Sequence, residues 1–347
     1  MGSKGQVKAV PTRRRGRAKI YALLGLALAV LVGVQTGLVG YGLAHLRAAT
    51  FPQDEALLAY VPAGTGGVLL VDPHQIELKS LGAEGGAARM YLTRTREEIK
   101  KAAGIDLAYD VDKLAIAPSL VVARGRFSHR RLADQLQESG YREAEHKGAK
   151  LLVRAGEDAL AVVGGDILLY GAEAAIRAGL DAEEAGTSLA EQDPVTDRLD
   201  VVGWDHPLLA TVQISDQKPS IREILAGSTG PRAITAGLAM KGGLQVKVAI
   251  ESASPAAAEE LRKLLEEKKG NADALRSLAG PDLGPAFAEV AKRAKITAQP
   301  DSSQLFITAD LTPEELDLVV KTLDQATAPL GELYKNVRLF QLLVPLP

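Results

Sequence analysis

The sequence predicts an α+β protein in which an N-terminal transmembrane helix precedes a duplicated, mostly antiparallel sheet-plus-helix domain. Three observations predict it: an uncharged stretch from residue 20 to 44, short apolar runs that alternate with helical patterns after residue 63, and a similar order of those patterns in two successive halves. The 347 residues are 46% hydrophobic and 24% charged, which is typical of a folded chain. The chain contains no cysteine, which excludes disulfides, thiolate zinc sites and a cysteine nucleophile.

The uncharged stretch 20–44 predicts a membrane anchor. As a helix it would be about 37 Å long, whereas a hydrocarbon core is about 30 Å thick. It is longer than the apolar core of a cleaved signal peptide, roughly 7–15 residues, so an uncleaved anchor is favoured over a cleaved signal. Residues 1–19 carry seven basic and no acidic side chains. The positive-inside rule therefore places this tail in the cytoplasm, the span in the inner membrane and the rest in the periplasm or outside the cell.

The predicted span carries small residues at every fourth position, namely Gly25, Ala29, Gly33 and Gly37. Such a stripe lets two helix backbones approach closely, so these four residues are candidates for helix association. The sequence thus predicts a homo-oligomer or a protein partner through the transmembrane helix.

The exported part is acidic. Residues 48–347 hold 33 basic and 43 acidic side chains. Nucleic-acid binding needs clustered Lys and Arg, so we expect no nucleic-acid partner.

The first half, residues 63–200 after a connector at 45–62, contains apolar runs bounded by Gly, Pro and Asp. Strands are expected at 68–71, 114–117, 120–123, 151–154, 160–163 and 167–170. Helices are expected at 94–103, at about 128–140 after Ser128, and at 172–180.

The second half, residues 201–328, repeats this order. Strands are expected at 208–214, 234–239, 244–250, 296–298 and 305–309, and helices at 219–225, 256–268, 275–279, 287–294 and 312–325. Matched pairs such as Val68 with Leu209, Ser128 with Ala256 and Leu160 with Leu305 predict an internal duplication. Whether the halves share one sheet or form two stays open at this point. Trp204, the only tryptophan, lies at the seam between the halves and is interpreted as a plug of the domain interface.

Several segments resemble a known group of proteins. They are YVPAGTGGVLLVD (60–72), GIDLAYDVDKLAIA (104–117), LVVARGRF (120–127) and ILLYGAEAAIRAGLD (167–181). With the basic tail and the span, they resemble uncharacterised bacterial single-span membrane proteins with a repeated exported α+β domain of unknown function. The resemblance covers residues 57–325 and implies the architecture, with no catalytic residue to carry over.

The sequence predicts no catalytic, cofactor or metal site. The glycine-rich turn 62–67 precedes a strand instead of following one and has no Lys, and the loop with Asp106, Asp110 and Asp112 lacks the central Gly of a calcium loop. Asp72 with His74, and Asp205 with His206, flank the first strand of each half. A His beside a carboxylate can act as a base or a metal ligand, but ordinary turns are the favoured interpretation.

The C-terminal tail, residues 329–347, is apolar near its end. If the tail is exposed, Leu339, Leu342, Leu343 and Val344 are candidate partner contacts, but docking onto the chain's own sheet as its last strand is the favoured interpretation.

We therefore expect a non-enzymatic envelope protein whose exported domain makes protein–protein contacts within a trans-envelope assembly. The alternative is a binding module that holds a lipid, peptide or glycan in a cleft between the halves.

Overall fold

The computed structural model describes residues 55–76, 93, 97, 100, 101, 104–107, 109–155, 158–191, 193–214, 231–240, 244–269 and 284–315. The predicted span with Gly25, Ala29, Gly33 and Gly37, and the tail with Leu339, Leu342, Leu343 and Val344, lie outside these residues. Within them, no helix is both long and apolar enough to cross a membrane.

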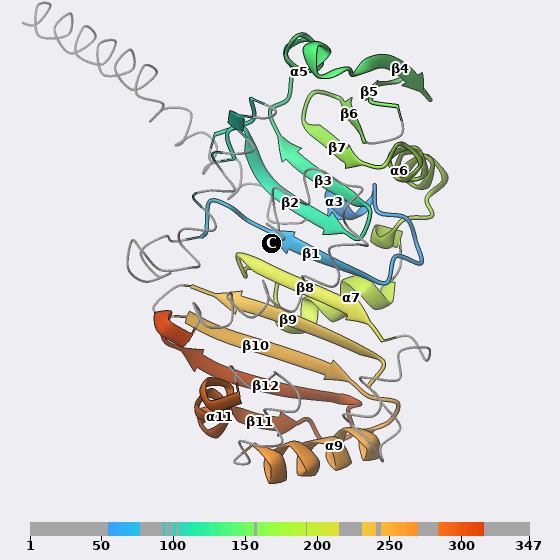
Figure 1. The fold of residues 1–347 in the computed structure, drawn as a ribbon. Coiled ribbons are helices and arrows are strands. Elements are labelled where there is room, and N and C mark those ends of the chain that lie inside the picture. The colour runs from blue at the N-terminus through green and yellow to red at the C-terminus, as the bar shows by residue number, and fades with distance from the viewer. Residues whose placement is uncertain are drawn as a thin grey trace, which may run out of the picture.

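The described residues build one twelve-stranded antiparallel sheet (Figure 1). Its order is β11-β12-β10-β9-β8-β1-β2-β3-β7-β6-β5-β4. The first seven strands in the chain are β1 (Gly67–Val71), β2 (Val111–Ala117), β3 (Leu120–Gly125), β4 (Arg142–His146), β5 (Ala149–Val153), β6 (Ala159–Val163) and β7 (Ile167–Gly171). The other five are β8 (Leu208–Gln213), β9 (Ala233–Ala239), β10 (Leu244–Glu251), β11 (Lys295–Ala298) and β12 (Gln304–Leu311). The prediction of an α+β fold with a mostly antiparallel sheet is confirmed.

The two halves meet at the pair β1–β8. These strands run antiparallel with five paired residues, from Gly67 opposite Val212 to Val71 opposite Leu208. Going outward from this pair, β1-β2-β3-β7-β6 on one side has the same order as β8-β9-β10-β12-β11 on the other. The question left open by the sequence is thereby answered: both halves share one sheet.

The helices that the structure describes are α3 (Glu55–Leu58), α5 (His129–Leu136), α6 (Glu173–Ala185), α7 (Asp193–Val202), α9 (Pro255–Lys268) and α11 (Gly284–Arg293), with short 3₁₀ turns η2 (Gln137–Ser139) and η3 (Leu189–Glu191). Ser128 caps α5 by accepting from Arg131 N at 3.4 Å, and Ser254 caps α9 by accepting from Ala257 N at 3.2 Å. Both caps satisfy backbone donors that the first turn of a helix leaves unpaired.

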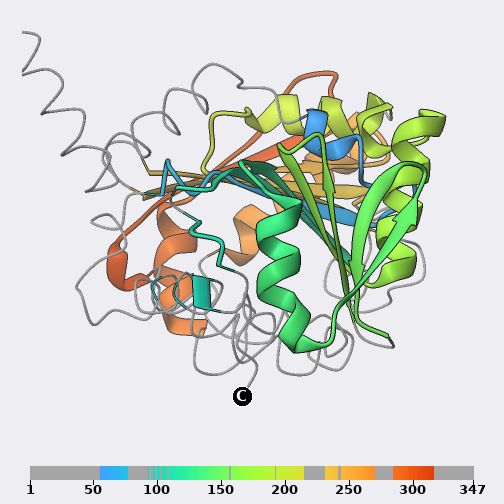
Figure 2. The same cartoon turned by 90° about the horizontal axis from the view of Figure 1, so that it is seen from above.

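The helices divide between the two faces of the sheet. On one face, α3, α6, η3 and α7 pack their leucines and valines on the alternate residues that include Leu70, Val122 and Leu209. We call this the α7 face. On the other, which we call the α5 face, α5 packs on Leu114 and Val121, and α9 packs on Ile250 and Leu305. Figure 2 shows α5 and α6 on opposite sides of the sheet.

Four elements had no counterpart in the sequence-based expectations, namely the short helix α3, the turn η3, the strand β4 and the helix α7. β4 reads REAEH and has four ionisable side chains in five residues, so no apolar alternation indicates a strand. It forms because the Lys147-Gly148 turn, with φ values of 50° and 78°, folds it back on β5 in register. The helix α7 was also not expected, and it covers β8, β9 and β10 on the α7 face.

Candidate interaction surface

The middle of the α5 face carries apolar side chains that no described helix covers. The pairing registers place Leu69 opposite both Ile116 and Ala210, and Ala210 opposite Ala236. Since residues paired in a sheet point to the same face, these side chains form one surface. We call Leu69, Ala210, Val212 and Ala236 the central strip. None of these four belongs to a hydrophobic core cluster of the described residues.

The central strip is partly open to solvent. Val212 is 49% exposed, and Leu69, Ala210 and Ala236 are partly exposed. The strip crosses the strands β9, β8 and β1 and reaches β2, so it is about 14 Å wide at roughly 4.8 Å per strand. An apolar surface that a folded domain leaves open to solvent can serve as a binding surface.

Three packed clusters border the strip. On the β2 side, Val71 and Ile116 join the cluster of α5, and on the β9 side Ile234 joins the cluster of α9. At one end, Leu208 and Leu238 pack with the buried side chains of Met240 and Leu244, together with Ile76 and Leu311. The central strip is therefore a shallow apolar surface that lies between the region covered by α5 and the region covered by α9.

The α7 face of the same strands is closed by polar contacts as well as by packing. Lys247 Nζ donates to the carbonyl oxygens of Val201 at 2.9 Å and Val202 at 3.0 Å, at the C-terminus of α7. A cation at this end of a helix is stabilised by the helix dipole. Arg198 of α7 pairs with Glu251 of β10 at 2.6 Å. These contacts fasten α7 over β10, so the α5 face is the one left for a further contact.

The two Asp–His turns come together but do not form a joint site. Because β1 and β8 are antiparallel, the end of one lies beside the start of the other, and Asp72 N donates to Pro207 O at 2.8 Å. The carboxylate of Asp72 accepts from the backbone of His74 at 3.0 Å and from the side chain of Gln75 at 2.8 Å. His206 Nδ1 lies 2.9 Å from Gly203 O and 3.3 Å from Asp205 Oδ1. Asp72 and Asp205 therefore make these contacts within their own turns, which agrees with the interpretation of both segments as ordinary turns.

The acidic loop also consists of local contacts. Asp110 Oδ2 accepts from Asp106 N at 2.8 Å, and Lys100 Nζ lies 2.9 Å from Asp106 Oδ2. Among the residues that the structure describes, no three His, Asp or Glu side chains are grouped so that they could hold a metal ion. In the glycine-rich segment, Thr65 folds back on Pro62 O through its N–H at 3.2 Å and its hydroxyl at 2.7 Å, which is the predicted turn.

Trp204 lies partly buried at the seam and packs against the main core cluster of the α7 face. Its indole N–H donates to Asp200, one turn earlier. The prediction that it plugs the seam agrees with this packing.

A charged cluster fastens the edge hairpin β4–β5 to α6. His146 Nε2 lies 2.8 Å from Asp181 Oδ1, and its Nδ1 lies 3.0 Å from Arg177 Nη1. Hydrogen bonds from His146 and then Lys147 hold the pKa of Asp181 below its usual range. The hydrogen bonds to Glu184 and Asp181 raise the pKa of Lys147. Lys147 and Glu184 of this cluster are exposed, and Asp181 is partly exposed. The cluster therefore attaches the β4–β5 hairpin to α6.

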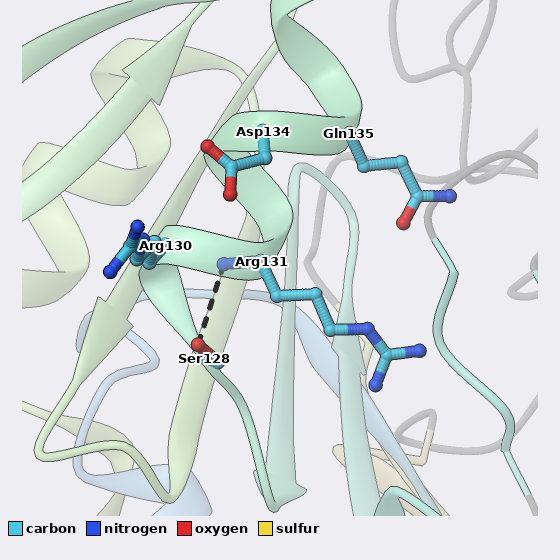
Figure 3. Close-up of a pocket in the computed structure, with 5 residues that line it drawn as sticks. All are labelled: Ser128, Arg130, Arg131, Asp134 and Gln135. Atoms are coloured by element: carbon cyan, nitrogen blue, oxygen red, sulfur yellow. Dashed lines mark hydrogen bonds between the residues drawn. The ribbon is translucent and has the colours of Figure 1, made fainter.

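Tyr60 and a hollow beside α5 are two further places where polar groups gather. Burial, and then the negative charges of Glu183 and Asp166, raise the pKa of Tyr60, so its hydroxyl stays protonated. An open hollow of about 480 Å³ lies beside α5 and is lined by Ser128, Arg130, Arg131, Asp134 and Gln135 (Figure 3). Arg131 Nη2 is engaged by Gly104 O at 3.1 Å, and Ser128 Oγ by the helix cap. The guanidinium of Arg131 and the hydroxyl of Ser128 therefore make contacts within the fold.

Comparison with known proteins assigns no family. No family model matches the sequence, and no curated protein matches it. Solved structures of TP0453 match with 10% identity. Crystal form III gives a TM-score of 0.46 over 76% of this chain and 97% of that chain, and crystal form I gives 0.44 over 77% and 97%. At this level the match transfers no function.

Proposed function

We propose that this chain is a membrane-anchored envelope protein whose exported domain binds a protein partner, and that the central strip is the contact surface. The observation that carries the proposal is the partly exposed apolar surface that Leu69, Ala210, Val212 and Ala236 form in the middle of the α5 face. Burying such a surface stabilises a complex by roughly 25 cal/mol per Å² of apolar area before the costs of association.

The anchor belongs to the same proposal. The uncharged stretch 20–44 and the seven basic residues before it support a single span with a cytoplasmic N-terminus and a periplasmic or extracellular domain. Gly25, Ala29, Gly33 and Gly37 support association through the span. The matched strand order on the two sides of β1–β8 supports a duplication as the origin of the exported domain.

The alternative prediction, a ligand cleft between the halves, gains no support from the seam. β1 and β8 are joined there by a continuous backbone ladder, and Leu209 and Leu70 on the α7 face are buried. Polar residues in these same strands, such as Thr211 and Thr235, bond to each other at 3.0 Å.

The test is the native mass of the tagged full-length protein in mild detergent, with identification of what co-purifies. Val212→Asp places a charge in the strip, and because Val212 is about half exposed we expect the fold to survive. The matched control is Glu145→Lys on the exposed edge strand β4. We expect a stoichiometric assembly that the control retains and Val212→Asp loses. An assembly unchanged by Val212→Asp, or a bare monomer in all three, would contradict the proposal.

A further inference from the structure

At the C-terminal side of the chain, the described residues end shortly after the cluster that borders the central strip. Leu311, the last residue of β12, packs against the buried Met240 and Leu244, the same cluster that Leu208 and Leu238 join at the end of the strip. Four residues later, Glu315 is held by Arg293 Nη2 at 2.6 and 2.7 Å, on α11 of the α5 face. The chain therefore continues from the cluster that borders the strip, two strands away from β9, and on the same face of the sheet.

The start of this continuation is a helix start. Thr312 Oγ1 accepts from Glu315 N at 3.2 Å, and Glu315 Oε2 accepts from Thr312 N at 2.8 Å. This reciprocal pair is a capping box, which fixes the direction in which the chain enters its next segment. Arg293 adds a charge-assisted contact to the same carboxylate.

The sequence beyond this point supplies an apolar segment of suitable size. Thirty-two residues follow Glu315, and the stretch from Leu339 to Pro347 carries no charge. At about 3.3 Å per extended residue, the ten residues 337–346 span roughly 33 Å, more than twice the width of the strip. The preceding residues 316–336 leave ample length to bring them there.

We infer that residues 329–347 of the chain itself occupy the central strip in the free protein, with Leu339, Leu342, Leu343 and Val344 as contacts. When the apolar tail lies on the partly open central strip, the two surfaces shield one another from water. A partner that uses the strip displaces the tail. This last point rests on the proposed function, whereas the docking of the tail does not.

The absence of native cysteine allows a direct test with introduced thiols. Ala210→Cys places one thiol in the middle of the strip, and Glu145→Cys places a control thiol on β4. In the purified full-length protein we expect a truncation after Ala328 to raise the rate of maleimide labelling at Ala210→Cys by about tenfold, and to leave the control unchanged.

Disulfide formation then identifies the occupant. Ala210→Cys is combined in turn with a cysteine at Leu339, Leu342, Leu343 or Val344, and each pair is oxidised under dilute conditions. A disulfide requires Cβ atoms about 3.5–4.5 Å apart, so we expect a cross-link within one chain for one or two of the four pairs. Cross-links only between chains would assign the strip to a second copy. Protection of Ala210→Cys that depends on added phospholipid vesicles would assign it to lipid. Either result, or equal labelling with and without the tail, would overturn the inference.

The two proposals fail separately. If the tail cross-links but the truncated protein recovers no more partner than the full chain, the proposed function fails and the docking stands. If Val212→Asp abolishes the assembly while the tail neither protects nor cross-links, the docking fails and the proposed function stands.

Discussion

Asp158 shows how single residues hold the far end of the sheet together. Its side chain is 2% exposed, and it accepts from Arg154 Nε at 3.0 Å, from Arg154 Nη2 at 2.7 Å and from the hydroxyl of Tyr170. Arg154 also lies over the ring of Tyr141, with 5.1 Å from Cζ to the ring centroid. The contacts link the β5–β6 hairpin to β7.

We expect Asp158→Ala to lower the free energy of unfolding by about 3–5 kcal/mol, because the buried Arg154 loses its carboxylate. Tyr170→Phe removes one hydrogen bond to a charged group and should cost about 1.5–3 kcal/mol. The control is Glu173→Gln in the exposed pair with Arg177, where we expect less than about 0.5 kcal/mol. Urea unfolding measures all three. An Asp158→Ala protein as stable as the control would contradict this account.

Asp181 predicts a pH dependence of stability. The hydrogen bonds from His146 and Lys147 lower the pKa of Asp181 in the folded protein below its ordinary value of 3.8. Its contribution to stability is therefore fully present above pH 3.8 and is lost as the pH falls through the lower folded pKa. We expect Asp181→Asn to be less stable than the wild type at pH 6 and the two melting temperatures to converge towards pH 2. A constant difference across this range would show that Asp181 does not titrate as described.

At the scale of elements, α6 approaches the connector so closely that one position must be glycine. A Cβ added to Gly179 would lie 2.6 Å from Tyr60 O, a backbone atom that cannot move aside cheaply. At Gly66, by contrast, an added Cβ would meet nothing within 4 Å.

We expect Gly179→Ala to destabilise the protein by about 1–3 kcal/mol, although alanine has the higher helix propensity, because overpacking against backbone outweighs that gain. Gly66→Ala is the matched control and should change stability by less than about 0.5 kcal/mol. Thermal unfolding of the two variants makes the comparison. A more stable Gly179→Ala would mean that α6 packs less tightly on Tyr60 than the structure has it.

The elements also show what could be predicted from sequence. Strands with compact apolar runs, such as Val68–Val71 and Ile167–Tyr170, and helices with cap signals, such as Ser254-Pro255, were predicted correctly because their local signals agree with their burial. β4 was not predicted because it is a charged edge strand without the apolar alternation that indicates a strand. Charged side chains on an edge strand also prevent it from pairing with other chains. Matching Leu160 with Leu305 was wrong by one strand, since β12 occupies the place of β7 and not of β6.

The candidate surface could not be read from the sequence for a different reason. Leu69, Ala210 and Ala236 lie far apart in the chain and are adjacent only through the registers of β1, β8 and β9. Each of these strands looks from its sequence like an ordinary core strand. In the sequence, one Asp–His turn follows its strand β1, whereas the other precedes its strand β8. The antiparallel pairing of β1 with β8 nevertheless brings both turns to the same end of the pair.

At the scale of the whole molecule, the account depends on β1 and β8 joining both halves into one sheet. Five residue pairs form this joint, and the central strip exists only because the two strands are neighbours. α7 lies over the joint on one face, and the strip lies on the other.

Native-state hydrogen exchange of the full-length protein tests this joint most directly. We expect the amides of β1 and β8 to exchange together and slowly, through opening of the whole sheet, while the amides of the exposed edge strand β4 exchange much faster. If β1 and β8 exchanged as fast as β4, or on two separate timescales, the halves would be independent units. The strip could then not be a single surface.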